Sequence, residues 1–183
     1  MSSRIPALDP VNATGKTAEL FAAVKGKLGV VPNLMRTLGQ SPAALEAYLG
    51  FSGTLATGVL PGKVREQLAL AVAETNACDY CLAAHSLLGK GAGLSADAII
   101  AARRVSAADA KTDALLKFAA GVVESRGLVA DEAVAAVRAS GASDAEIIET
   151  VAHVALNILT NYTNHVAQTV VDFPEAAALP VAV

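Results

Sequence analysis

The chain has 183 residues and a formal net charge of −3, and its composition is 54% hydrophobic but only 4% aromatic. This length allows one domain, residues 1–183, with a sizeable core, whereas the weak charge gives no case for binding nucleic acid or an anionic membrane. Two cysteines are too few for a disulfide-rich secreted scaffold. The sequence shows neither a signal-peptide core nor an apolar run of roughly 20 residues, so we expect a cytoplasmic protein.

Prolines divide the chain into two parts. Five of the seven occur by position 61, and none follows until position 174. A long proline-free stretch rich in alanine and leucine is typical of consecutive helices, and no segment alternates as a strand would. We therefore expect an all-α protein, with helices over about these ranges: 17–28, 42–58, 61–75, 77–89, 96–105, 108–125, 131–140 and 144–171.

Capping residues mark where several of these helices begin. Ser41 directly precedes a proline and is typical of an N-cap. Ser143 and Glu146 have the spacing of a capping box, in which each side chain accepts from the other's backbone N–H. Asn76 is expected to cap the helix that carries the cysteines, and the last helix has a candidate break near Asn161.

The most informative motif contains both cysteines. Cys78 and Cys81 form a C-x-x-C pair, and His85 follows four residues later. On a helix these three residues share a face. A helix N-terminus stabilises a thiolate, the second sulfur can close a disulfide, and a histidine four residues after Cys81 can take or return its proton. The spacing therefore predicts dithiol redox chemistry.

The sequence gives less support to three other functions of this motif: zinc binding, haem attachment and a thioredoxin-type site. The cysteines and His85 could bind zinc with His153 or His165 as a fourth ligand, but no second cysteine pair supports such a site. Haem attachment needs a histidine where Leu82 stands, and a thioredoxin motif would follow a strand. We otherwise expect His153 and His165 to pack or to cap helices.

Glu66 allows two interpretations. It lies near the start of the expected helix 61–75, which is apolar on nearly all sides and so is expected to be buried. Burial there would suit the carboxyl group to proton relay. Alternatively, Glu66 is a surface residue that favours the helix dipole and pairs with Lys63 or Arg65. The residues alone favour the surface alternative.

Residues 29–85 resemble the AhpD-like alkylhydroperoxidase branch of the carboxymuconolactone decarboxylase family. The matching residues are Gly29-Val30-Val31-Pro32-Asn33, Arg65-Glu66, Cys78-Asp79-Tyr80-Cys81 and His85. Similarity to the C-terminal part of the family's peroxidase-related members is carried by Thr160-Asn161-Tyr162-Thr163-Asn164-His165 and Asp172-Phe173-Pro174. The resemblance therefore covers most of the chain beyond about residue 17.

The resemblance implies an AhpD-like helical domain with its redox motif at 66–85, assembled as a homo-trimer or hexamer. It also implies a thiol-dependent peroxidase or disulfide reductase without cofactor or metal. In this reading Glu66 and His85 relay a proton for Cys81, which attacks a hydroperoxide. Cys78 then resolves the sulfenic acid as a disulfide, and a reducing dithiol protein or small thiol reopens it.

The chain departs from the resemblance at one position. Tyr80 stands where the best-described peroxidases of this branch have a second histidine. A phenol is a poor base at neutral pH, but Tyr80 could donate a hydrogen bond to a bound peroxide or thiolate. Two other functions stay open: the lactone decarboxylation that names the family, which needs no cysteines, and a redox-sensing or structural oligomer. A mean hydropathy of +0.48 favours buried apolar surface between subunits.

Overall fold

The computed structural model describes residues 3–179, which form helices and no strand and so confirm the all-α prediction. The helices are α1 (Gly15–Leu28), α2 (Asn33–Leu38), α3 (Pro42–Leu55), α4 (Gly62–Thr75), α5 (Asp79–Gly91), α6 (Ala96–Arg103), α7 (Ala110–Ser125), α8 (Asp131–Ala139) and α9 (Asp144–Ala167). None of the helices in this range is both long and apolar enough to cross a membrane.

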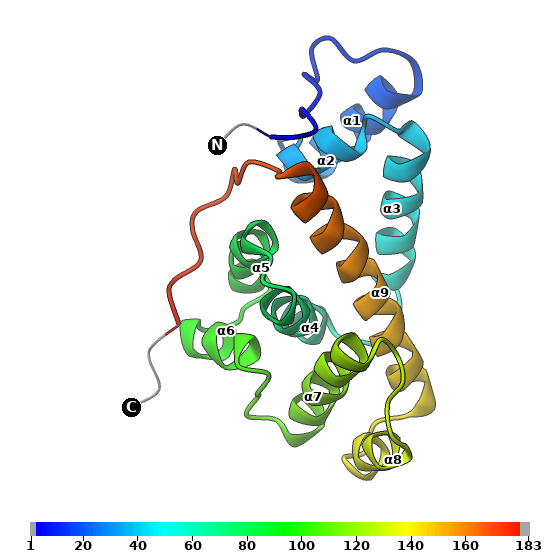
Figure 1. Ribbon diagram of the computed structural model, residues 1–183, viewed down its shortest axis with the longest axis vertical. Coiled ribbons are helices and arrows are strands. Elements are labelled where there is room, and N and C mark those ends of the chain that lie inside the picture. Colours follow the sequence, from blue (N-terminus) through cyan, green and yellow to red (C-terminus); the bar gives the residue numbers. More distant parts are fainter. Residues whose placement is uncertain (1–2, 180–183) are drawn as a thin grey trace.

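Helix α4 forms the centre of the molecule. It packs against α5, α6, α7 and α9, which surround it in Figure 1. Every residue from 67 to 73 is buried, as the apolar character of this helix predicts. Because α5 packs directly on α4, the cysteine motif is attached to the most buried element of the fold.

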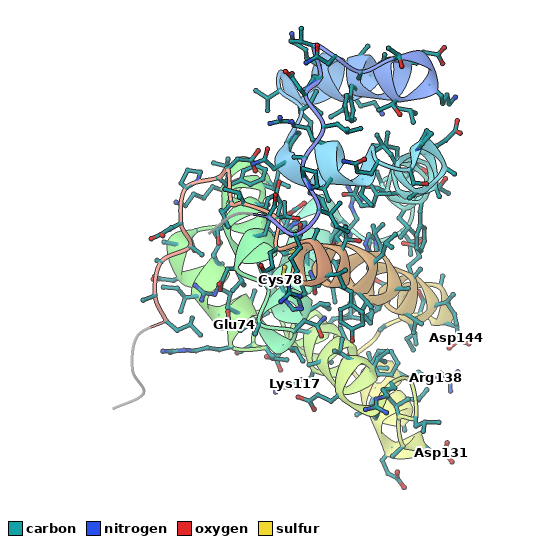
Figure 2. The ribbon with its side chains drawn as sticks, turned by 45° about the horizontal axis from the view of Figure 1, so that its top comes forward. Glu74, Cys78, Lys117, Asp131, Arg138 and Asp144 are labelled. Carbon is teal, nitrogen blue, oxygen red and sulfur yellow. The ribbon has the colours of Figure 1, made fainter. Side chains whose placement is uncertain are left out.

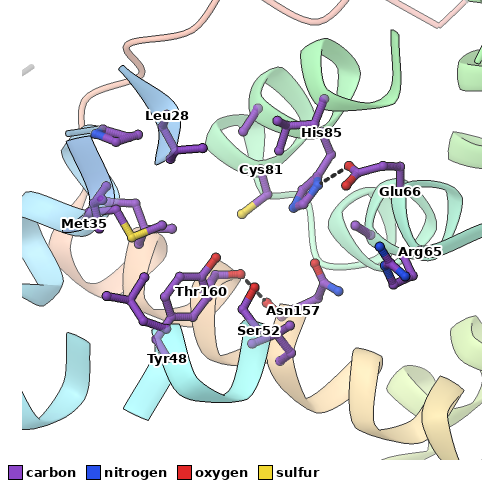
Figure 3. A pocket seen from close by; sticks show the side chains of 18 of the residues that line it. Leu28, Met35, Tyr48, Ser52, Arg65, Glu66, Cys81, His85, Asn157 and Thr160 are labelled. Atoms are coloured by element: carbon purple, nitrogen blue, oxygen red, sulfur yellow. Dashed lines mark hydrogen bonds and ion pairs between the residues drawn. The ribbon is translucent and has the colours of Figure 1, made fainter. Parts of the chain in front are cut away.

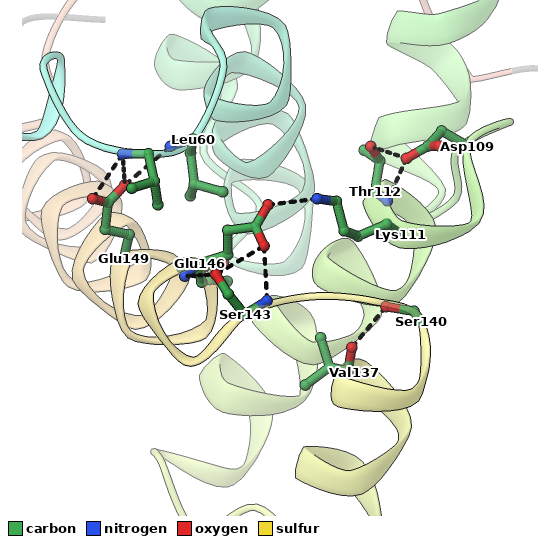
Figure 4. Close-up of polar contacts among 11 residues, drawn as sticks. Leu60, Asp109, Lys111, Thr112, Val137, Ser140, Ser143, Glu146 and Glu149 are labelled. Atoms are coloured by element: carbon green, nitrogen blue, oxygen red, sulfur yellow. Dashed lines mark hydrogen bonds and ion pairs between the residues drawn. The ribbon is translucent and has the colours of Figure 1, made fainter.

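The predicted caps at Ser41 and Ser143 are present. The Ser41 hydroxyl accepts from the Ala44 N–H at 3.3 Å, and Ser143 and Glu146 form the reciprocal capping box. Glu146 also accepts from Lys111 Nζ at 2.6 Å, which joins the start of α9 to α7 (Figure 4). The same end of the molecule carries a surface ion pair between α8 and α9, visible in Figure 2.

The candidate break near Asn161 does not occur. Helix α9 continues through this position because the Asn161 side chain does not compete for its own backbone. Its Oδ1 accepts from Asn76 Nδ2 at 2.9 Å across the fold. Asn157 and Thr160 do bond backbone carbonyls within α9, but these contacts leave the helix intact.

The prediction that Asn76 caps the cysteine helix is wrong. Asn76 is the C-cap of α4, Ala77 follows in the left-handed region with φ of 52°, and Cys78 is the N-cap of α5. The Cys78 N–H donates to the Ala73 carbonyl at 2.9 Å, so the chain turns within a few residues. Cys81 therefore lies in the first turn of α5, where backbone N–H groups favour a thiolate.

A segment near the C-terminus packs beside α5. Asp172 accepts from the Asn33 N–H at 2.8 Å and from the Tyr80 hydroxyl at 2.8 Å. The segment then runs past α5 and α6 (Figure 1), where Arg103 donates to the Ala177 carbonyl. The start of α2, the motif helix and the segment at Asp172 thus meet at one place.

Candidate active site

Both cysteines are buried and reduced. Cys78 is 1% exposed and Cys81 is 2% exposed, and their sulfurs lie 2.8 Å apart, with Cys78 donating to Cys81. Figure 2 places Cys78 within the helices, near the end of α4 marked by Glu74. The two sulfurs are close enough to form an intramolecular disulfide with local adjustment.

Helix α9 supplies polar groups to the sulfurs. Asn164 Nδ2 lies 3.3 Å from Cys81 Sγ and 3.9 Å from Cys78 Sγ. The hydrogen bond from Cys78, followed by those from Asn164, Asn161 and Thr160, lowers the pKa of Cys81 despite burial. The bond to Cys81 and burial raise the pKa of Cys78. Cys81 is therefore the sulfur that ionises first.

These α9 side chains were not among the site residues predicted from the sequence. The available signal was their place in the segment Thr160 to His165, which carries part of the family resemblance. Nothing in their spacing indicates which helix they face. Only the packing of α9 beside α5 brings their hydroxyl and amide groups to the sulfurs.

Replacing Asn164 with leucine is expected to move the alkylation midpoint of Cys81 to higher pH by about one pH unit. The variant removes a hydrogen bond to the thiolate, and a bond to a charged group contributes about that much. Iodoacetamide alkylation rates against pH would measure the midpoint. Thr163→Ala is the matched control, because the Thr163 hydroxyl donates to the Leu159 carbonyl and not to sulfur. An unchanged midpoint for Asn164→Leu would contradict the assignment.

Glu66 and His85 form a pair beside the sulfurs. His85 Nδ1 lies 2.8 Å from Glu66 Oε2, and each side chain is 22% exposed. Glu66 thus faces His85, whereas Arg65 donates to the Leu60 carbonyl at 2.7 Å. Figure 3 shows His85 and Cys81 facing one cavity, although no hydrogen bond joins them in the described residues. The geometry favours the relay interpretation of Glu66 over the surface pair with Arg65 or Lys63.

Tyr80 joins α5 to α2 and to the segment that contains Asp172 and Phe173. Its hydroxyl accepts from the Leu34 N–H at 3.0 Å and donates to Asp172 at 2.8 Å. Its ring meets Phe173 edge to face, with centroids 5.5 Å apart. Burial raises the pKa of Tyr80, so the phenol stays protonated. Both sides of the hydroxyl are thus engaged in this structure, and a role of Tyr80 as donor to a bound peroxide or thiolate stays a prediction.

The sulfur of Cys81 opens on a cavity of about 550 Å³. Its walls come from α1 to α5 and α9 and are mostly aliphatic, with Leu28 and Met35 across from Cys81 in Figure 3. Polar groups line the rest of the cavity, among them Ser52, Thr160, Asn157 and Arg65. A pocket of this size and composition suits a small, largely apolar molecule.

The other two histidines do not reach the sulfurs. His165 Nε2 lies 3.3 Å from the Ala77 carbonyl oxygen, at the turn that leads into α5. His153 lines the cavity from α9, and burial followed by the charge of Arg65 lowers its pKa. Across the described part of the chain, no three His, Cys, Asp or Glu side chains are grouped to hold a metal ion.

Solved structures with this fold include two proteins described as uncharacterized and peroxidase-related. One, from Ralstonia eutropha JMP134, is described as an alkylhydroperoxidase AhpD core and aligns with a TM-score of 0.84 at 22% identity over 94% of this chain and 93% of that chain. The other, from Silicibacter sp. TM1040, aligns with a TM-score of 0.78 at 23% identity over 92% of this chain and 93% of that chain.

The debrominase Bmp8 also has this fold. Its apo structure aligns with a TM-score of 0.78 at 20% identity over 92% of both chains, and a variant with one cysteine replaced by alanine was solved in complex with 2,3,4-tribromopyrrole. No curated protein matches the chain by sequence. The segment 42–125 matches the carboxymuconolactone decarboxylase family, and the helices of the chain adopt the AhpD-core fold.

Proposed function

We propose that the protein is a thiol-dependent peroxidase that reduces organic hydroperoxides with its C-x-x-C dithiol. The observation that carries this proposal is the position of Cys81. Its sulfur has a lowered pKa, opens on an apolar cavity, and lies one helical turn before the Glu66–His85 pair. A thiolate, a nearby proton donor and room for an organic molecule are what peroxide reduction requires.

In the first step, the Cys81 thiolate attacks one oxygen of the hydroperoxide. The O–O bond breaks, Cys81 becomes a sulfenic acid, and the alkoxide leaves. His85 donates the proton that converts the alkoxide to an alcohol, and Glu66 orients the imidazole through Nδ1. Here Cys81 is oxidised by two electrons and the hydroperoxide is reduced by two.

In the second step, Cys78 attacks the sulfenic sulfur. A disulfide forms between the two cysteines and one water is released. An external dithiol, either a protein or a small thiol, then exchanges with this disulfide and restores both thiols. The 2.8 Å separation of the sulfurs supports Cys78 as the resolving residue.

Reductive debromination is the second candidate function. The cavity is mostly aliphatic and about 550 Å³, which is large enough for a small halogenated ring beside Cys81. The same dithiol would supply two electrons: the ring exchanges bromine for hydrogen, bromide leaves, and the cysteines end as a disulfide. Lactone decarboxylation, by contrast, gives the buried dithiol no role.

A two-substrate assay tests the proposal. The parent protein is incubated with cumene hydroperoxide or with tribromopyrrole, each with a panel of dithiol reductants, and peroxide loss and bromide release are measured. Dithiol-dependent peroxide loss well above the rate without protein is the expected result. Bromide release without peroxide loss would replace the proposal with the second candidate, and turnover of neither substrate would overturn both.

We also propose that the protein is a homo-oligomer, a trimer or hexamer, that buries one face of α9. Exposed apolar residues recur along this helix at spacings of three or four residues, the pattern of a helix that packs on a partner. They are Ile148, Val151, Ala155, Leu159, Tyr162 and Val166. The stripe lies on the side of α9 that does not face the sulfurs.

Leu159→Glu is expected to convert the oligomer to a smaller species, because the variant places a charge in a buried apolar contact. Light scattering at micromolar concentration measures the mass. Leu128→Glu is the matched control, since Leu128 is 87% exposed and lies between α7 and α8. A monomeric parent, or an unchanged mass for Leu159→Glu, would contradict the proposed interface.

A further inference from the structure

The cavity beside Cys81 opens to solvent near the end of α1. Leu28 and Val30 line it from the end of this helix and the connection that follows, and Leu87 and Leu88 line it from α5. These four residues, here named the apolar rim, are 43% to 61% exposed, whereas Cys81 is 2% exposed. The rim therefore marks an opening of the cavity, and Cys81 lies at the buried end.

The side of the cavity that α1, α2 and their connection form is apolar, with Lys27 as the exception. Its apolar residues are Val24, Leu28, Val30, Pro32, Leu34 and Met35. In Figure 3, Leu28 and Met35 lie on the side of Cys81 that is away from Glu66 and Arg65. This side therefore offers apolar contacts to a carbon chain that enters at the rim and extends toward Cys81.

Lys27 adds a positive charge to this opening. It is exposed, lies in the last turn of α1 and lines the same cavity. Within residues 3–179, no carboxylate forms an ion pair with it. Arg65 also lines the cavity, but it lies on the side of Glu66 and donates to the Leu60 carbonyl. The rim thus combines apolar surface with an unpaired ammonium group.

The charges at the two ends of the cavity would orient a bound anion. Burying a carboxylate in apolar surroundings costs far more free energy than burying a neutral group. Glu66 and the Cys81 thiolate also place negative charge at the buried end, which repels a second anion. A molecule with a carboxylate and a hydroperoxide is therefore expected to keep its carboxylate at the rim and to direct its hydroperoxide toward Cys81.

We propose that the substrate is an aliphatic hydroperoxide that also carries a carboxylate, and that Lys27 binds this carboxylate at the rim. The inference rests on the proposed peroxidase function and names its substrate class. The ion pair forms where the cavity meets solvent, so neither charged group has to be buried. The carbon chain between the two polar groups lies against the apolar side formed by α1 and α2.

Matched substrate pairs test this inference. Hexanoic, octanoic and decanoic acids with a hydroperoxide on the terminal carbon are each compared with the corresponding primary amide, which is neutral. At the best length and low salt, the parent is expected to favour the carboxylate by about fivefold in kcat/KM, the upper range for a partly exposed ion pair. Lys27→Glu should bring this ratio below one, because it places two like charges together, and Lys27→Gln should bring it close to one.

Lys25→Glu is the matched control. Lys25 also lies in the last turn of α1, so its replacement has the same effect on the helix dipole, but it does not line the cavity. This variant should retain most of the preference for the carboxylate. No preference in the parent at any length, or equal ratios for Lys27→Glu and Lys25→Glu, would overturn the inference.

A binding measurement separates this inference from the peroxidase proposal. Cys81→Ser protein is titrated calorimetrically with octanoate or octanamide, neither of which reacts. Tighter binding of octanoate that weakens as salt is raised, and that is lost when Lys27→Glu is added, supports the site even if no hydroperoxide is turned over and the proposed function fails. Equal affinities for the two ligands would overturn the inference, and so would binding of neither, the result expected if another protein chain covers the rim.

Discussion

Cys81→Ser is expected to lower hydroperoxide turnover by roughly three orders of magnitude or more, because it removes the attacking nucleophile. Cys78→Ser should behave differently. Its hydroxyl can still donate to the Cys81 thiolate in place of the thiol, so the first attack on peroxide is retained. Without a resolving sulfur, however, the sulfenic acid accumulates and turnover stops after one equivalent.

Single-turnover kinetics and trapping with dimedone distinguish the two variants. We expect a dimedone adduct on Cys81 in Cys78→Ser after peroxide treatment, and no adduct in Cys81→Ser. In the parent, loss of two thiols per chain without covalent dimers indicates the internal disulfide. An adduct on Cys78 in the Cys81→Ser variant, with single turnover intact, would reverse the roles of the two sulfurs.

The second large effect concerns His85. His85→Ala is expected to reduce peroxide turnover by roughly 10²-fold, the scale of general acid catalysis, because the leaving alkoxide loses its proton donor. Glu66→Gln should cost less, since the amide keeps a partner for His85 Nδ1 at the 2.8 Å contact. Both are measured as kcat with a saturating hydroperoxide.

Alkylation of Cys81 by iodoacetamide provides the control for His85→Ala. This reaction needs the thiolate but no proton donor, and Cys78 and the α9 side chains lower the pKa of Cys81 without help from His85. The alkylation rate should therefore fall much less than peroxide turnover. Equal losses in both reactions would show that His85 acts on the thiolate itself, and no loss in either would make it a packing residue.

Much of this architecture could be predicted from local chemistry. The capping box at Ser143 and the N-cap at Ser41 depend on residues within one turn, so their sequence signals are complete. The likeness of residues 29–85 to AhpD-like proteins indicated the fold as well. The short helix α2 was missed because its six residues are too few for a periodic pattern.

The parts of the site that escaped prediction depend on contacts distant in sequence. Asn164 lies 83 residues after Cys81, and Asp172 lies 92 residues after Tyr80. Asn76 was misassigned for the same reason, because its side chain pairs with Asn161 and not with the next helix. Local spacing identifies which residues can react, but the tertiary packing decides which groups stabilise the thiolate.

The contact of Asp172 with both Asn33 and Tyr80 has a consequence for biosynthesis. These bonds join residues separated by most of the chain, and such long-range pairings form late in folding. During translation, the cysteine motif leaves the ribosome long before Asp172 is made. The nascent chain therefore carries both thiols before Asp172 can bond Asn33 and Tyr80.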